Sequence, residues 1–176
     1  MATGYELAWD VVKTIGSAGW DLVVSNQKLG NLESQQANAV PNVEDWRNLY
    51  GSDHGTPVDM RYEQGWYFTS DDTTRAHVRL YYTCKARYQE AGWYIPNAWV
   101  DVVDIDPTYW NLAPDNELNI KVQVHGPENV GTPQEPIAAL GFSVNFVERS
   151  AVGEEAHKHY MVWIYGDGRD AYVTEG

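Results

Sequence analysis

The chain has 176 residues, of which 43% are hydrophobic and 21% are charged, and this composition is typical of one folded domain rather than a disordered segment. It carries 25 Asp and Glu against 12 Lys and Arg, a formal net charge of −13. This balance argues against binding to nucleic acid, whose phosphates require clustered Lys and Arg, and against docking on anionic membranes. Neutral ligands, cations and basic partners are compatible with it.

The first 16 residues lack the basic region and apolar block of a secretory signal, and no apolar run reaches membrane-spanning length. Cys84 is the only cysteine, so no internal disulfide can form. Its place on the apolar side of a strand pattern predicts a buried side chain. We therefore expect a soluble protein, either cytoplasmic or secreted without a classical signal.

Two similar segments open the chain, WDVVKTIG at 9–16 and WDLVVSNQ at 20–27. Apolar or aromatic residues fall at every second position in both segments: Tyr5, Leu7, Trp9 and Val11, and then Trp20, Leu22 and Val24. This alternation favours two strands joined in a hairpin through GSAG. A short helix over 6–15 is the alternative, because Leu7, Val11 and Ile15 are spaced by four.

Residues 25–74 are polar and rich in Asn, Gln and Gly, which predicts a long irregular segment. Within it, a short helix is expected near 43–50, with Asn42 as its N-cap and Gly51 after its end. The GWYFT run at 65–69 is a candidate strand. Irregular segments of this length in compact domains often carry function.

Strict alternation of apolar and polar residues dominates the second half of the chain. The clearest runs are 78–88, 118–125 and 140–146, followed by 157–165 and a Val-rich run at 99–105. Gly and Pro residues lie between these runs, notably at Pro96-Asn97, Pro107 and Gly126-Pro127. The pattern predicts a mainly antiparallel all-β fold: a single-domain β-sandwich over 1–176 with long loops and at most one or two short helices.

The aromatic composition is unusual, with 12 Tyr and 8 Trp but only 3 Phe. Trp and Tyr suit surfaces that are apolar on one side and wet on the other, as in carbohydrate sites and protein interfaces. Several Trp and Tyr pairs fall at predicted turns or strand ends with amides and carboxylates beside them. The candidate ligand-binding residues are Trp66, Tyr67, Trp93, Tyr94, Asn97, Tyr109 and Trp110. Trp99 is expected on the solvent face of its strand or between two layers.

An acidic run from 101 to 117 suggests a cation site. Asp104, Asp106 and Asp115 place carboxylates at a strand end and in the loop after it, and Ca²⁺ takes six to eight oxygen ligands. No EF-hand spacing accompanies them, and a solvated acidic loop explains the same pattern. We expect no other cofactor.

The sequence also lacks a nucleophile elbow, a phosphate-binding glycine loop, a dinucleotide fingerprint and a zinc protease motif. We therefore expect a non-catalytic, lectin-like protein that binds carbohydrate or another neutral small ligand. One alternative is a self-assembling subunit that buries its aromatic patches in a homo-oligomer. Another is a membrane-active, toxin-type β protein, which the negative charge disfavours.

Overall fold

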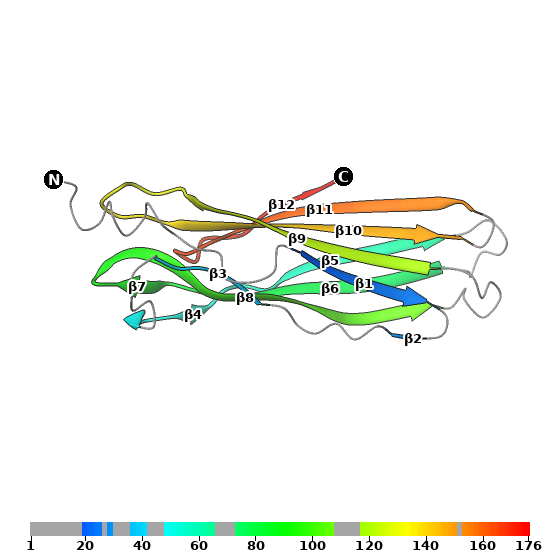
Figure 1. Cartoon of the computed structure of the whole chain (residues 1–176), viewed down its shortest axis with the longest axis horizontal. Helices are drawn as coiled ribbons and strands as arrows, with labels where there is room; N and C mark the ends of the chain where they lie inside the picture. The colour runs from blue at the N-terminus through cyan, green and yellow to red at the C-terminus, as the bar shows by residue number, and fades with distance from the viewer. Residues whose placement is uncertain are drawn as a thin grey trace.

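The computed structural model describes residues 19–25, 28–29, 36–41, 48–65, 73–107, 117–150 and 153–176; for residues 19–25, 28–29 and 107 it describes the backbone alone. Nearly all of this part of the chain is in strands, which form two antiparallel sheets packed face to face in an elongated sandwich (Figure 1). The predicted all-β sandwich is therefore confirmed.

Six strands make the first sheet. Their spatial order is β12 (Tyr172–Glu175), β11 (Glu155–Tyr165), β10 (Ala138–Arg149), β9 (Glu117–Asn129), β1 (Gly19–Ser25) and β2 (Lys28–Leu29). The strand predicted for the second of the two similar N-terminal segments is β1. Its predicted hairpin partner, with the alternative helix over 6–15, lies outside the described residues.

The second sheet also has six strands. It runs β3 (Gln36–Ala39), β8 (Ala91–Pro107), β6 (Thr73–Cys84) and β4 (Asp53–His54), while β5 (Val58–Gly65) pairs with β6 and β7 (Ala86–Tyr88) pairs with β8.

The core lies between the sheets and is built by the predicted alternation. On β6 the inward residues Val78 and Leu80 are fully buried, and Phe142, Val144 and Phe146 on β10 face them from the other sheet. Cys84 is 1% exposed, as its pattern predicts. Each fully buried apolar side chain of this kind contributes roughly 1.5–3 kcal/mol, so the facing rows hold the two sheets together.

The prediction of a continuous irregular segment over 25–74 is wrong for residues 28–29, 36–39, 53–54, 58–65 and 73–74, which lie in strands. In β5 the buried side chains of Val58, Met60 and Tyr62 alternate with exposed charged ones, and this period of two is the signal that predicts the strand. Most of the helix expected near 43–50 and of the strand expected at 65–69 lies outside the described residues.

The turn predicted at Pro96-Asn97 is also wrong, because both residues lie inside β8, a strand of 17 residues. The register against β3 passes from Ala37 opposite Ala98 to Ala39 opposite Ile95. Two residues of β8 therefore lie across from a single residue of β3, which makes a β-bulge. Proline is tolerated within sheets at bulges, so here it marks an irregularity rather than an end.

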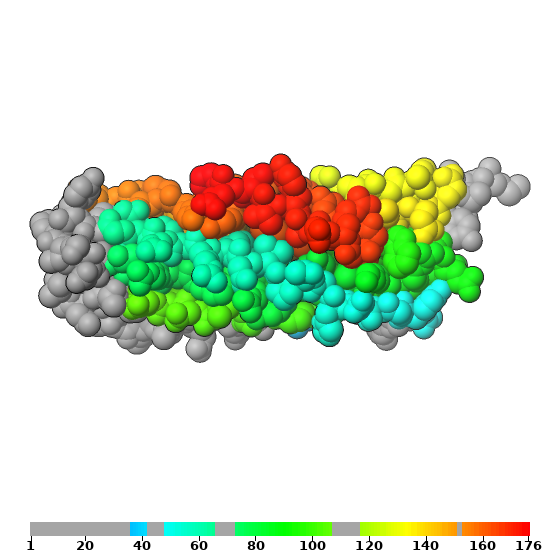
Figure 2. Space-filling view, turned by 180° about the vertical axis from the view of Figure 1, so that it is seen from behind, coloured from blue at the N-terminus to red at the C-terminus, as the bar shows by residue number. Residues whose placement is uncertain are grey.

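The edges of the two sheets meet along one side of the molecule, where the C-terminal residues lie beside β5 (Figure 2). The Tyr160 hydroxyl on β11 donates to the carbonyl of Arg61 on β5 at 2.6 Å and accepts from the Arg61 N–H at 3.3 Å. An edge strand carries unpaired backbone groups that can recruit other strands, and this hydroxyl satisfies one such pair.

No helix long and apolar enough to cross a membrane occurs in the described ranges.

Candidate functional site

The structure describes three of the seven predicted ligand-binding residues, namely Trp93, Tyr94 and Asn97. The other four, Trp66, Tyr67, Tyr109 and Trp110, lie outside the described residues. Tyr94 is 1% exposed and belongs to the core, so the prediction of a surface ring at this position is wrong. Asn97 is half-buried within β8, and its backbone carbonyl lies 3.4 Å from the Thr83 hydroxyl across the strand pair.

Trp93 is half-buried at the end of the sandwich, where the sheets are joined through the backbone. The backbone N–H of Trp93 donates to the carbonyl of Pro136 at 2.8 Å. The Arg87 guanidinium lies 4.1 Å from the centre of its ring and forms an ion pair with Glu135 at 2.6 Å. Because Arg87 occupies one face of the indole, the structure gives this ring a role in closing the end of the sandwich.

The acidic run over 101–106 lies in strand β8 and not in a loop. Its carboxylates border a row of charged side chains on the outer face of the second sheet, which we call the ladder of charges. A register shift at His77 and Val78 makes a bulge at Val103, which explains why the carboxylates alternate imperfectly with valines. In the register of β6 and β8, Asp104 lies opposite His77 and Asp106 lies opposite Arg75. Among the described residues no group of three His, Cys, Asp or Glu side chains could hold a metal ion, and Asp115 lies outside them.

The outer face of the second sheet continues this ladder on β5 and β6. Asp59 lies 2.6 Å from the Arg79 guanidinium and 2.5 Å from His77 Nε2. Hydrogen bonding from Arg79 holds the pKa of the Asp59 carboxyl below its usual range. On the same face Trp99 stacks on Tyr81, with ring centres 5.4 Å apart. Trp99 is thus on the outer face, one of the two positions expected for it, and one face of its ring is occupied by Tyr81.

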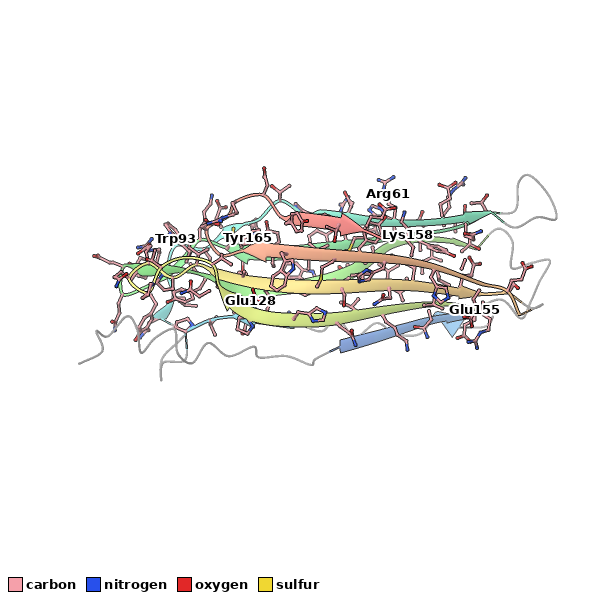
Figure 3. The ribbon with its side chains drawn as sticks, turned by 90° about the horizontal axis from the view of Figure 1, so that it is seen from above. Arg61, Trp93, Glu128, Glu155, Lys158 and Tyr165 are labelled. Carbon is pink, nitrogen blue, oxygen red and sulfur yellow. The ribbon has the colours of Figure 1, made fainter. Side chains whose placement is uncertain are left out.

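Figure 3 looks onto the outer face of the first sheet, where β9, β10 and β11 lie side by side. The residues on this face have a different chemistry. Strand register aligns His125 of β9, Gly141 of β10, Trp163 of β11 and Tyr172 of β12 in one row across four strands. The flanking β11 residues Val162 and Ile164 are fully buried, so Trp163 points outward. Tyr172 is 57% exposed at the edge of the row.

The indole of Trp163 lies against the backbone of β10. A Cβ atom on Gly141 would come within 3.0–3.1 Å of three atoms of its ring, and one on Gly126 within 3.8 Å of a fourth. The ring therefore leans from β11 across β10 toward β9, and Gly141 is the residue that lets it lie so close. We call the Trp163 indole ring, held in this way against the outer face of the sheet, the plate.

Hydrogen-bonding groups border the plate on the β9 side. His125 Nε2 lies 2.8 Å from the Ser143 hydroxyl, and the next row across the strands contains Gln123, Ser143, Met161 and Thr174. Ser143 is 6% exposed and lies in the middle of a strand, so the pair is poorly placed for nucleophilic attack. The Ser143 hydroxyl is well placed to fix the orientation of the His125 imidazole.

The two rows together carry no Asp, Glu, Lys or Arg, although the chain has 37 such residues. We call these eight residues the Trp163 surface: His125, Gly141, Trp163, Tyr172, Gln123, Ser143, Met161 and Thr174. Among the described side chains of β9, charged residues begin in the neighbouring outward-facing rows, with Lys121 on one side and Glu128 on the other.

Sequence reasoning did not select the Trp163 surface. Two signals point to it: Trp163 falls on the polar face of its alternating strand, and Gly141 interrupts an otherwise apolar strand. What alternation cannot supply is the strand order that brings β9, β10, β11 and β12 side by side.

Comparisons with known protein families, with curated proteins and with solved structures found no match for this chain.

Proposed function

We propose that this protein is a non-catalytic carbohydrate-binding protein whose ligand stacks on the outer face of the Trp163 indole. The observation that carries the proposal is the indole plate over Gly141, bordered by uncharged hydrogen-bonding side chains. A sugar ring presents an apolar C–H face, which an exposed aromatic ring covers, while its hydroxyls need donors and acceptors around the ring.

Two residues of the surface, His125 and Gln123, supply those donors and acceptors. His125 is already oriented by its contact with the buried Ser143 hydroxyl, and Gln123 is exposed in the neighbouring row. Neither of them carries a fixed charge. The hydroxyls of a neutral ligand can therefore form hydrogen bonds here without desolvation of a carboxylate or an ammonium group, which would cost several kcal/mol.

An array of neutral glycans, probed with and without EDTA, tests the proposal. We expect binding that EDTA does not remove, and a loss of about tenfold or more in affinity for Trp163→Ala because the stacking surface is gone. Trp99→Ala is the matched control, since it removes a tryptophan from the outer face of the other sheet and should leave affinity unchanged. A blank array, or equal losses for both variants, would contradict the proposal.

A second variant keeps the indole and moves it. Gly141→Val places a side chain where the ring now lies, so the ring must lift from the sheet. We expect weaker glycan binding with the fold retained by circular dichroism. Gly65→Val is its control, because a Cβ on this strand glycine meets no atom of the described residues within 4 Å. Unchanged affinity in Gly141→Val would show that the position of the plate is unimportant.

A further inference from the structure

We infer that the ligand is a neutral oligosaccharide chain lying across the strands, with one sugar ring on Trp163 and a second on Tyr172. This inference rests on the proposed function and extends it from a single stacked ring to a chain with a defined direction. It follows from the positions of the two aromatic residues in the row, from the lean of the indole and from the distribution of charge.

The direction comes from the register. Trp163 and Tyr172 are directly paired on β11 and β12, so both side chains project from the same face. Four strands separated by about 4.8 Å give the row a length of roughly 14 Å from β9 to β12. Aromatic side chains occupy its β11 and β12 positions, and His125 occupies its β9 end.

The lean of the indole separates the two stacking positions. Because the Trp163 ring extends over Gly141 toward β9, it lies on the side of β11 that faces away from Tyr172. A sugar ring on the plate therefore leaves the Tyr172 ring uncovered, and Tyr172 is 57% exposed, the highest value among the large exposed hydrophobic residues described. Tyr172 lies two strands beyond Gly141, roughly 10 Å along the row, so a chain of several linked rings that continues along the row reaches it.

The chemistry of the row and its neighbours selects a neutral chain. Neither row of the Trp163 surface has a charged side chain that could pair with a uronate, and the chain as a whole carries −13. An anionic ligand would lose hydration here without gaining a partner and would approach a protein of the same sign. A neutral polymer has neither cost.

Calorimetric titrations with glucose, mannose and N-acetylglucosamine, each as one, two and four β-linked rings, test the inference. For the sugar that binds, we expect affinity to rise about five- to tenfold from one ring to four, because only the longer chain spans both stacking positions. Tyr172→Ala should abolish that gain while leaving the affinity for one ring unchanged. Val173→Ala, on the other face of the same strand, is the control and should keep the gain.

The outcomes separate the inference from the proposed function. Equal affinity for one and four rings, or a gain that survives Tyr172→Ala, overturns the chain model while a Trp163-dependent site stands. Absence of binding by every sugar overturns both. A glucuronic acid tetramer gives a further arm, which we expect to bind at least about tenfold more weakly than its neutral counterpart; equal or tighter binding would overturn the neutral selection.

Discussion

Glu148 is a fully buried carboxylate between the two sheets, and two neutral hydroxyls satisfy it. Tyr62 on β5 donates to it at 2.9 Å and Thr74 on β6 at 2.6 Å. The Tyr62 ring also stacks on Phe146, with ring centres 5.5 Å apart. Since Glu148 lies on β10, this cluster joins the two sheets through two side-chain hydrogen bonds, each of which typically contributes about 0.5–1.5 kcal/mol.

Buried tyrosines of this kind make the fold sensitive to alkali. Burial, together with the neighbouring Glu148 carboxylate, raises the pKa of Tyr62 well above its ordinary value, and burial raises the pKa of Tyr94 to about 12. In the unfolded chain both titrate near 10. Above that pH the unfolded state binds fewer protons than the folded state, so the free energy of unfolding falls as the pH rises.

We therefore expect urea denaturation to show stability that is present below pH 10 and declines above it, by about 1.4 kcal/mol per pH unit for each tyrosine that stays protonated in the fold. Tyr62→Phe should lower stability at neutral pH, because Glu148 loses a donor, and should make the alkaline decline shallower. Tyr172→Phe, at an exposed position, is the control. A decline of the same slope in Tyr62→Phe would refute the assignment to Tyr62.

At the level of elements, alternation predicts most of the second half of the fold from the sequence. The runs at 118–125, 140–146 and 157–165 become β9, β10 and β11, because a strand buried on one face must repeat every two residues. Pro96 and Gly126-Pro127 mislead, since bulges and long strands accommodate residues that usually end a strand.

The candidate site was harder to predict than the strands for a specific reason. Neither Gly141 nor Trp163 is informative alone, and they meet only through the pairing of β10 with β11. The opposite holds for Trp93 and Tyr94, which the sequence predicts as a binding surface although the structure packs them into the molecule. Its sequence resembles a surface turn, yet tertiary packing buries one ring and covers the other with Arg87.

The N-terminal end of β8 yields a stability prediction. Trp93→Ala removes a half-buried ring that packs under Arg87 at the junction of the sheets, so we expect the free energy of unfolding to fall by about 1–3 kcal/mol with glycan binding intact. Trp99→Ala should cost less, because its stack with Tyr81 lies on the outer face of one sheet. Lost binding with unchanged stability in Trp93→Ala would restore this ring as the ligand platform.

At the scale of the whole molecule, the two outer faces of the sandwich differ in chemistry. The second sheet presents a ladder of paired charges, including Asp59 with Arg79 and Glu63 with Arg75. The first sheet presents the uncharged Trp163 surface. In a chain with a net charge of −13, an area without Asp, Glu, Lys or Arg is the part of the surface best suited to a neutral ligand, and the charged face of the second sheet favours solubility.

Amide and indole N–H chemical shifts, recorded while the strongest neutral glycan is titrated into labelled protein, test this account most directly. We predict that the indole signal of Trp163 and the backbone signals of Gly141 and Gln123 shift together and saturate, while those of Trp93 and Trp99 do not move. Shifts confined to the outer face of the second sheet, or to residues outside the first sheet, would contradict the assignment of the site.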